Sequence, residues 1–518
     1  MMSKKLEKIE RQAEEKDLLV QKPTIITPEF IAEEIWDRKT NPKYLVYHFS
    51  DKRFEELTQI SLGETNRKGQ NIIYVPVFNE ALRKGLVIVP SGYCKTTFAE
   101  VFADIDNFAK NAYDACGQEK IVTLLCRVTV GSWFLDRFVA NPEFDIAGAG
   151  KFAPIIPIRG PSQSGKNRLA FILRLISYKP YFEMSTYRIP SLFRPLDVWQ
   201  GTLILDEADF ANTNEKSELV HFLNCRATGT PLSRQNPKNP KITDTFSNFG
   251  LTIVTQRKSF DDNATESRAL PYYSETTDKK LPVLETDDML KEGLALQNKL
   301  LYLRMTYYDK VRIDKKQWID GLTDHRLIAT LLPMLALAEY EPQLITIITD
   351  NAKAFQRAKI EEKANSMDGT LVNCLWEKIK EGNFAEYQKD LFYFYESSEI
   401  TRVKDREGVD PVEHLTRTIL TTQILAEKFK WSSRSIRSAL NSLNIARKGL
   451  PHSITIEGKT HRVVFFEGDR IERRLREFVP DYSPNEVHGK KEITQVTQIT
   501  LSTCGEKGDK ENGQKTLV

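Results

Sequence analysis

The spacing of apolar residues divides the chain into segments with different predicted secondary structure. Short apolar runs at 71–77 and 86–90 predict strands within an otherwise mixed region. From Phe98 to Phe138 the apolar residues recur at helical spacing, and the second of the two helices predicted there is apolar on nearly every face, which indicates burial. Between about 152 and 273, short apolar runs alternate with helical stretches. This alternation is typical of a parallel sheet covered by helices.

Composition and charge limit the classes of protein to which the chain can belong. Of its 518 residues, 40% are hydrophobic and 28% charged, so most of the chain is expected to fold, in about three domains. The net charge is only +3, and any basic surface must therefore be local. Six cysteines show neither a CxxC nor a Cys/His spacing, which disfavours disulfides and structural zinc and suits a cytoplasmic location. The longest mostly apolar run, Leu327–Ala338, has about half the ~20 residues of a membrane helix, so no membrane partner is expected.

A glycine-rich sequence follows the apolar run Ile155–Arg159. It is GPSQSGKN, and a helical pattern begins directly after it. In this G-x-x-x-x-G-K pattern between a strand and a helix, backbone N–H groups surround phosphate oxygens and the lysine reaches the β- and γ-phosphates of a nucleotide. Lys166 is therefore also a catalytic candidate. The residues predicted to bind ATP are Gly160, Pro161, Ser162, Gln163, Ser164, Gly165, Lys166, Asn167 and Arg168.

One position of this loop departs from the pattern. Asn167 stands where a serine or threonine hydroxyl normally ligates Mg²⁺. Its amide oxygen is also a ligand that a hard cation accepts, although it lies on a longer side chain. Asn167 is therefore a candidate metal ligand, and nucleotide binding is expected to tolerate this residue better than fast hydrolysis does.

Two carboxylates follow the apolar run Thr202–Leu205, and the first of them lies 40 residues after Lys166. Open α/β sheets bind their ligands at the carboxyl ends of the strands. Asp206 is therefore predicted to hold Mg²⁺, directly or through water, and Glu207 to orient the attacking water. A solvated pair of acids in a turn is the alternative, but the order and spacing of the two motifs favour the catalytic interpretation.

The next apolar run, Leu251–Gln256, ends in two polar residues. Either Thr255 or Gln256 is predicted to orient the water or contact the γ-phosphate, and the alternative is that they simply end the strand. Arg268, further along the chain, is a candidate arginine finger that would neutralise γ-phosphate charge across a subunit boundary. The alternative for Arg268 is a surface ion pair with Glu266.

Residues 412–466 have the pattern of a winged helix. Helices are predicted at Thr422–Phe429 and Ser433–Leu443, and a two-stranded wing at 453–466. From Thr421 to Lys448 there are six basic residues and one acidic residue, a local positive charge of the kind that DNA phosphates attract. The predicted DNA-binding residues are Arg434, Ser435, Arg437, Ser438, Asn441 and Lys459. A winged helix that binds protein is the alternative.

Further motifs accompany the loop and the carboxylates between about 96 and 340. They are Trp133–Phe138, Ser191–Arg194, LILDEADF at 203–210, His221–Asn224, Arg234 and the stretch from Arg257 to Leu270. With these motifs, about half of the chain resembles a largely uncharacterised family of P-loop ATPases of archaea, phages and plasmids. That family is similar to AAA+-like motors, including superfamily 3 helicases and primase-helicase ATPases. The resemblance implies ATP and Mg²⁺ as cofactors, and it implies that Arg326 reaches the nucleotide from a lid domain.

The predicted fold class is α/β, with a P-loop NTPase (AAA+-like) core, flanking helical regions and a C-terminal winged helix-turn-helix domain. The predicted regions are a charged disordered or helical arm (1–25), a mixed N-terminal region (26–96), the ATPase core with its leading helices (97–284), a helical lid domain (285–400), the winged helix (408–480) and a disordered tail (481–518).

Three functional hypotheses follow. The first is an ATP-dependent DNA motor, helicase- or translocase-like, that acts as a homo-oligomer, expected to be a hexameric ring, in replication or maintenance of a plasmid, virus or mobile element. The second is a non-motor DNA-binding initiator or regulator in which ATP controls assembly. The third is a signalling ATPase whose winged helix binds protein. ATP and DNA binding are inferred from residues, whereas movement along DNA follows only by analogy from the fold.

Overall fold

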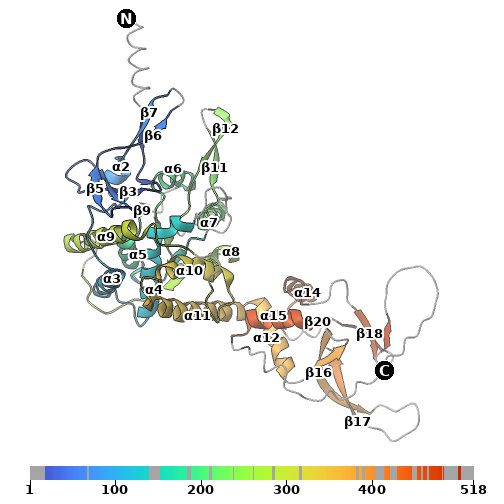
Figure 1. The fold of residues 1–518 in the computed structure, drawn as a ribbon. Helices are drawn as coiled ribbons and strands as arrows, with labels where there is room; N and C mark the ends of the chain where they lie inside the picture. The colour runs from blue at the N-terminus through green and yellow to red at the C-terminus, as the bar shows by residue number, and fades with distance from the viewer. Residues whose placement is uncertain are drawn as a thin grey trace. The chain divides into compact units, whose positions relative to one another are not determined.

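The computed structural model describes most of the chain, in segments separated by gaps. The described residues are 18–66, 69–138, 152–183, 188–208, 213–236, 239–260, 262–282, 286–313, 318–380, 384–387, 391–402, 413–419, 429–445, 452–456, 459–463, 466–480, 482 and 500–502. They fall in two compact units, residues 1–353 (unit 1) and 354–518 (unit 2). Figure 1 labels the elements of both units. In the described part of the chain, no helix combines the length and the apolar character needed to span a bilayer.

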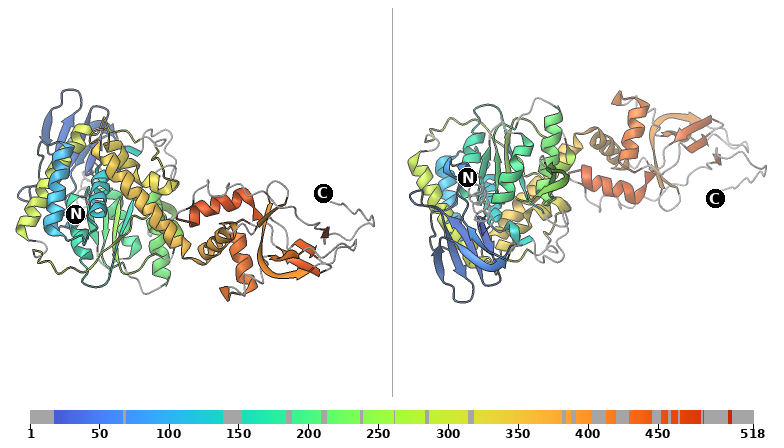
Figure 2. Two further views of the ribbon diagram at one scale, coloured as in Figure 1. Left: turned by 90° about the horizontal axis from the view of Figure 1, so that it is seen from below. Right: turned by 90° about the horizontal axis from the view of Figure 1, so that it is seen from above.

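The core of unit 1 is a five-stranded parallel sheet with helices around it (Figure 2). In spatial order its strands are β14 (Tyr272–Tyr273), β8 (Ile155–Arg159), β13 (Thr252–Gln256), β10 (Leu203–Leu205) and β9 (Tyr181–Glu183). The three middle strands are buried along their whole length, as expected for a parallel sheet covered on both faces. The chain leaves β8 toward β9 and later returns to the other side of β8 as β14. The topological switch point of the sheet therefore lies at β8, and the α/β prediction is confirmed.

Helices surround this sheet. They are α3 (Phe98–Ala112), α4 (Glu119–Gly131), the 3-10 helix η1 (Ser132–Phe138), α5 (Lys166–Ile176), α6 (Ile189–Trp199), α7 (Thr213–Thr228), α8 (Asn263–Glu266), α9 (Asp287–Tyr307) and α10 (His325–Leu337). The predicted apolar stripe of α3 is buried, and α4 is buried without interruption from Leu124 to Gly131. α5 packs against β8, β13 and α9, while α6 and α7 share a core cluster with β10. A hairpin, β11 (Leu232–Asn236) and β12 (Asn239–Phe246), follows α7.

The N-terminal region consists of two small sheets rather than isolated strands. One contains β1 (Leu19–Gln21), β7 (Asn71–Val75) and β6 (Ile60–Thr65), and the other β2 (Thr24–Ile26), β3 (Phe30–Ile35), β4 (Lys43–His48) and β5 (Phe54–Leu57); α2 (Glu80–Arg83) follows. The arm predicted for 1–25 is therefore wrong for residues 19–25, because β1 pairs with β7, β2 pairs with β3, and Ile25 is buried. Residues 1–17 lie outside the described residues. The strand predicted at 86–90 is present only as an isolated antiparallel bridge between Val87 and Tyr181.

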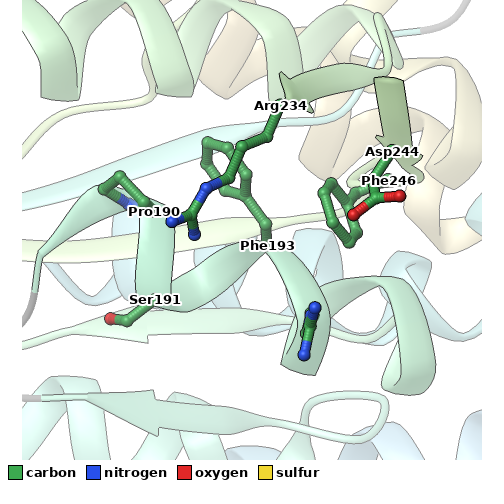
Figure 3. A pocket seen from close by; sticks show the side chains of 7 residues that line it. Pro190, Ser191, Phe193, Arg234, Asp244 and Phe246 are labelled. Atoms are coloured by element: carbon green, nitrogen blue, oxygen red, sulfur yellow. The ribbon is translucent and has the colours of Figure 1, made fainter. Parts of the chain in front are cut away.

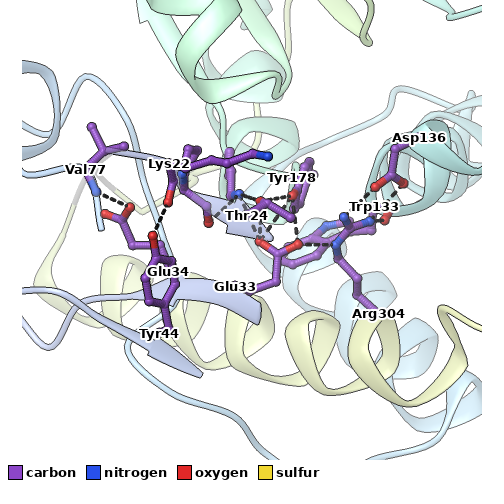
Figure 4. A network of polar contacts seen from close by, with 12 residues as sticks. Lys22, Thr24, Glu33, Glu34, Tyr44, Val77, Trp133, Asp136, Tyr178 and Arg304 are labelled. Carbon is purple, nitrogen blue, oxygen red and sulfur yellow. Dashed lines mark hydrogen bonds and ion pairs between the residues drawn. The ribbon is translucent and has the colours of Figure 1, made fainter. Parts of the chain in front are cut away.

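A buried network of charges joins the N-terminal sheet to the core of unit 1 (Figure 4). Glu33 on β3 pairs with Lys179, at 2.9 Å, and with Arg304 on α9, at 2.6 Å. Arg304 also pairs with Asp136 and donates to the carbonyl oxygen of Trp133. Removing one member would leave a buried charge unpaired, which costs about 3–5 kcal/mol. The network therefore fixes the N-terminal sheet on the core of unit 1.

Unit 2 begins within α11 (Gln343–Ala364) and has its own apolar core. That core combines α12 (Met367–Lys380), α14 (Ser433–Ser442) and α15 (Gly468–Phe478). The strands of unit 2 are β15 (Phe384–Tyr387), β16 (Leu391–Arg402), β17 (Glu413–Ile419), β18 (His452–Ile456), β19 (Lys459–Val463), β20 (Phe466–Glu467) and β21 (Thr500–Ser502).

Several predictions for unit 2 can be compared with these elements. The helix at 433–443 is present as α14, and the two strands of the predicted wing are the β18–β19 hairpin. The helix predicted at 422–429 lies outside the described residues except for Phe429. Strands β15 and β16 occupy the end of the segment predicted to be a helical lid (285–400), because its aromatic run has high strand propensity. The tail predicted to be disordered contains β21, which pairs with β18.

Candidate nucleotide site at the carboxyl edge of the sheet

The loop that follows β8 has a backbone shape that few residue types allow. Gly160, Gln163 and Gly165 all have positive φ, of 149°, 66° and 84°. A Cβ atom at Gly160 would lie 2.5 Å from the carbonyl oxygen of Ser274 and 2.6 Å from Ser164 Oγ, so only glycine fits there. Alternation of right- and left-handed residues turns successive N–H groups toward one point and forms a concave anion site. The positive φ of Gln163, unusual for a residue with a side chain, is part of this shape.

The helix α5 begins directly behind this loop. Its N-cap residue, Gly165, provides no side-chain hydrogen bond to the first turn, so the N–H groups and the positive end of the helix face the loop. The Lys166 ammonium donates to the carbonyl oxygens of Gly160, at 2.8 Å, and Pro161, at 2.6 Å. A phosphate would offer this ammonium a charged acceptor, which makes a stronger hydrogen bond than a neutral carbonyl. Pro161, Ser162 and Gln163 are exposed, so the loop is open to solvent.

The structure brings the loop and the carboxylates together. Asp206 Oδ2 accepts a hydrogen bond from Asn167 Nδ2 at 3.1 Å. Asp206 Oδ1 accepts from Thr255 Oγ1, at 2.5 Å, and from the N–H of Glu207, at 3.0 Å. Asp206 is buried, whereas Glu207 is exposed and has a positive φ of 53°. One fixed carboxylate and one solvent-facing carboxylate therefore lie beside the loop.

The two polar residues at the end of β13 lie between these partners, because β13 separates β8 from β10. Both hydrogen bonds of the Thr255 hydroxyl go to the end of β10, since its Oγ1 donates to Asp206 and also accepts from the N–H of Glu207 at 2.9 Å. Gln256 is 4% exposed, and its Nε2 has no hydrogen-bond partner in the described structure. An unsatisfied buried amide costs about 1–3 kcal/mol, so an acceptor such as a phosphate oxygen or a bound water fits this position.

The donor set also fits Mg²⁺. This ion usually keeps several waters and is held by one or two carboxylates together with phosphate oxygens of the substrate. Asp206 supplies such a carboxylate within reach of the loop. Asn167 acts here as a hydrogen-bond donor to Asp206, so its predicted role as a direct metal ligand would require its amide oxygen to turn toward the ion.

Residues that sequence reasoning missed support the loop from behind. The N–H of Ser274 donates to the carbonyl oxygen of Arg159 at 2.7 Å, and its hydroxyl donates to the carbonyl oxygen of Ser164. The Tyr113 hydroxyl bonds Ser274 Oγ at 2.9 Å and Tyr272 at 3.2 Å. Burial raises the pKa of Tyr113, which keeps this phenol protonated. The sequence Tyr272-Tyr-Ser274, which has strand propensity, is the signal that could have identified this strand.

The side chains of the three arginines considered for the site are hydrogen-bonded to other parts of the chain. The Arg168 guanidinium, in the first turn of α5, donates to the carbonyl oxygens of Ala112 and Pro282, at 3.1 and 2.8 Å. Arg326 donates to Ser267 Oγ. Arg268 precedes β14 at the level of Ile155, the amino end of β8, whereas the loop follows the carboxyl end.

The contacts of Arg268 exclude a surface ion pair with Glu266, which was the alternative to the finger role. Its Nη1 donates to Asn224 Oδ1, at 3.0 Å, and to the carbonyl oxygen of Ala264, at 2.7 Å. Glu266, the partner considered for it, pairs instead with the buried Arg159. Burial lowers the pKa of Arg268, and the neighbouring Arg326 lowers it further.

A cavity of about 350 Å³ lies between α6 and the β11–β12 hairpin (Figure 3). Figure 3 shows Arg234 reaching from the hairpin toward Pro190 at the start of α6. Arg194 of α6 also lines the cavity, together with two phenylalanines. Asp244 lies across the hairpin from Arg234, yet neither arginine forms an ion pair within the described part of the chain. Two unpaired guanidinium groups therefore face one cavity.

The predicted DNA-binding face of α14 is partly described. Ile436, Leu440 and Leu443 are buried, as expected for the opposite face of this helix. Ser432 caps the helix by accepting from the N–H of Ser435 at 3.1 Å. Arg434, Ser438 and Asn441 are exposed and Ser435 is half-buried; the side chains of Arg437 and Lys459 lie outside the described residues.

Comparisons with known proteins give structural neighbours only. No family model and no curated protein match the chain. Among solved structures it is similar to the active helicase Cch of SCCmec type IV, at 12% identity and a TM-score of 0.39, over 87% of this chain and 79% of that one. It is also similar to the apo structure of the NrS-1 C-terminal region, at 12% identity and a TM-score of 0.36, over 84% of this chain and 96% of that one. We therefore infer the function from the residues of the site.

Proposed function

We propose that this chain binds ATP with Mg²⁺ at the loop after β8 and hydrolyses it while bound to DNA, as a helicase- or translocase-like motor. The observation that supports the proposal best is the contact between Asn167 and Asp206. It brings an anion-binding loop and a fixed carboxylate together at the switch point of a parallel sheet, which is where such sheets bind ligands.

Each residue of the site has a role in the proposed reaction. Lys166 moves from the loop carbonyls to the β- and γ-phosphates and neutralises their charge. Asp206 would hold Mg²⁺, which when bound neutralises charge that develops on the phosphates. Glu207 orients the attacking water, Thr255 holds the Asp206 carboxylate and the Glu207 backbone, and the Gln256 amide donates to the water or to the γ-phosphate.

The position of Arg268 leads us to propose an oligomer. It lies at the amino end of β8, and β8 spans roughly 15 Å at about 3.3 Å per residue, so Arg268 cannot serve the nucleotide of its own chain. A finger role requires that it enter the site of a neighbouring subunit, as in a homo-oligomeric ring. Replication or maintenance of a plasmid, virus or mobile element is the setting that the sequence resemblance implies.

The proposed DNA contacts lie in both units. In unit 1, Arg194 and Arg234, which pair with no acidic group among the described residues, offer guanidinium groups to phosphates. In unit 2, the proposed contacts are Arg434, Ser435, Arg437, Ser438, Asn441 and Lys459. A second candidate function, a DNA-binding switch with slow turnover, is favoured by Asn167, because its amide donates to Asp206 where a hydroxyl would normally ligate the metal.

Steady-state ATPase assays with and without DNA, with nucleotide binding measured in parallel, test the proposal. Lys166→Ala is expected to abolish ATP binding. Glu207→Gln should bind ATP but hydrolyse it roughly 100-fold more slowly or worse, because the general base is lost. Glu215→Gln, on the exposed part of α7, is the matched control. DNA-stimulated turnover with strand displacement supports the motor, ATP-dependent DNA binding with negligible turnover supports the switch, and normal turnover of Glu207→Gln contradicts the site.

A further inference from the structure

Unit 1 contains a second cavity, of about 580 Å³, lined by none of the residues discussed so far as part of the nucleotide site. Its volume lies within the range of about 300–1,000 Å³ that small-ligand sites occupy. Its walls come from the turn between β4 and β5, from the segment that precedes α3, and from the C-terminal part of α9. We refer to it as the Tyr93 cavity, after its most exposed aromatic residue.

The aromatic residues of the Tyr93 cavity are stacked. The rings of Phe54 and Tyr93 are almost parallel, at 11°, with centroids 4.2 Å apart. Tyr302 on α9 lies 5.9 Å and 24° from Phe54 and 6.3 Å and 15° from Tyr93, so the three rings form a cluster with nearly parallel planes. Tyr93 is 40% exposed, so a further planar group can approach this ring. Stacking on such rings is how proteins hold unpaired bases without sequence preference.

Three lysines surround this stack. Lys52 and Lys95 are exposed, and Lys310 lies over the ring of Tyr307 at 4.9 Å. None of the three forms an ion pair with a residue that the structure describes. The N-terminus of α3 also lines the cavity, through its N-cap Thr97. There the Glu100 carboxylate accepts from the N–H of Thr97, at 2.9 Å, and from Thr96 Oγ1, at 3.1 Å, so this helix end is already compensated.

The acidic groups near the cavity lie outside its lining. Asp51 is paired with Arg53 at 3.3 Å, Glu100 is held by Thr96 and Thr97, and Asp309 lies near Tyr47. The lining of the cavity therefore combines nearly parallel aromatic rings with three lysines and no acidic residue.

The exposed ring is held in place before any ligand arrives. Asn298 Oδ1 accepts from the N–H groups of Ser91 and Gly92, at 3.0 and 3.2 Å, and its carbonyl oxygen accepts from the N–H of Cys94 at 3.1 Å. The segment that carries Tyr93 is thus fixed to α9, the helix that also carries Tyr302. A site whose groups are already ordered loses less conformational entropy on binding.

We propose that the Tyr93 cavity binds single-stranded nucleic acid, with a base stacked on Tyr93 and the adjoining phosphates contacted by Lys52, Lys95 and Lys310. This inference rests on the proposed DNA-binding function and assigns a part of it to the N-terminal region. Lysines and rings at one site match the two parts of a nucleotide, the phosphate and the base. The stack is separate from the arginine cavity between α6 and the β11–β12 hairpin, since the two share no lining residue.

Photocrosslinking locates the contact directly. The full chain is incubated with a fluorescent oligothymidylate that carries 5-iodouracil, irradiated, and digested for mass spectrometry. A crosslink to Tyr93 or Phe54 is expected in the wild-type chain and also in Lys166→Ala, because the site does not depend on bound ATP. Binding of the oligonucleotide with crosslinks confined to other segments would overturn the inference but leave the proposed function intact. No binding of the oligonucleotide would reject both.

Affinity measurements separate stacking from charge. Tyr93→Ala is expected to weaken oligothymidylate binding roughly 5- to 150-fold, whereas Tyr93→Phe keeps most of the affinity. The triple variant Lys52→Gln, Lys95→Gln, Lys310→Gln should reduce the slope of log affinity against log salt by about 2, since each phosphate contact contributes about 0.7 for single strands. The control triple, Lys110→Gln, Lys120→Gln, Lys216→Gln, changes exposed lysines of α3, α4 and α7. Equal salt slopes in the two triple variants, or unchanged oligothymidylate affinity in Tyr93→Ala, refute nucleic-acid binding at the Tyr93 cavity. A protein segment would then be the occupant to consider.

Discussion

Glu34 gives the sharpest physical prediction of the structure. It lies on β3, fully buried, beside the network of Figure 4. Its Oε2 accepts from the N–H of Val77 at 2.8 Å, while its Oε1 has no partner in the described structure. Burial raises the pKa of this carboxyl from 4.5 to about 8, against smaller opposing effects of the Val77 hydrogen bond and of Lys179; Glu33 raises it slightly. Glu34 is therefore protonated in the folded chain at neutral pH.

The raised pKa makes the free energy of unfolding fall with rising pH. Below pH 4.5 the carboxyl is protonated in both states and costs nothing. Between pH 4.5 and about 8 the unfolded chain releases the proton and the folded chain keeps it, so stability falls by about 1.4 kcal/mol per pH unit. Above about 8 the folded chain ionises as well and the loss stops. From pH 6 to pH 9 this single group should remove about 2.5 kcal/mol.

Glu34→Gln removes that dependence. The glutamine amide has the same shape, and its oxygen can still accept from the N–H of Val77. Its NH₂ group would take the place of Oε1, and if this donor stays unsatisfied, the free energy of unfolding of the variant falls by about 1–3 kcal/mol at every pH. Urea unfolding followed by tryptophan fluorescence, at pH 6, 7, 8 and 9, measures the difference between the two proteins, so groups common to both cancel. Glu80→Gln, an exposed acid on α2, is the control and should parallel the wild type. If the curves of wild type and Glu34→Gln stay parallel from pH 6 to pH 9, Glu34 is ionised in the folded state and the reasoning is wrong.

The remaining predictions concern function. Arg268→Ala should lower ATPase turnover roughly 1,000-fold or more with ATP affinity unchanged. Mixing it with Lys166→Ala should restore part of the activity, because each variant supplies the residue that the other lacks at a site shared between subunits. No recovery on mixing, or full activity of Arg268→Ala alone, contradicts an arginine finger that acts in a neighbouring subunit. The double variant Arg194→Gln, Arg234→Gln should weaken DNA binding and reduce the slope of log affinity against log salt by about 1.4 to 1.8, with basal ATPase unchanged. An effect on DNA affinity no larger than that of Lys216→Gln would exclude the arginine cavity as a phosphate contact.

Most of the candidate nucleotide site could be predicted from local sequence patterns. The order strand, glycine loop, helix and the later strand ending in two acids are short-range patterns, and the structure has all four where they were expected. What could not be predicted is long-range. The support of the loop by Ser274 depends on β14 pairing with β8, more than 100 residues away in the chain, and a two-residue strand leaves almost no periodicity to detect.

The N-terminal region shows a different limit of sequence reasoning. Its strands are short, and Glu33 and Glu34 look like solvated acids in the sequence, yet both are buried. Their burial is possible because Lys179 and Arg304, which lie far along the chain, neutralise Glu33, while Glu34 keeps its proton. Charge pairing across more than 100 residues leaves no local pattern, so the sequence alone left this region without a role.

Long-range packing also explains why neither of the proposed nucleic-acid contacts in unit 1 could be predicted from the sequence. Arg194 and Arg234 become a pair only because the β11–β12 hairpin lies against α6. Phe54, Tyr93 and Tyr302 become a stack only because Asn298 fixes the segment before α3 to α9. The net charge of +3 over 518 residues indicates neither site, because a local excess of positive charge is cancelled by acidic residues elsewhere in the chain. For a chain of this kind, unpaired cations that share a cavity with aromatic rings are a better guide to nucleic-acid binding than composition, because phosphates respond to charge within about a Debye length and not to the total.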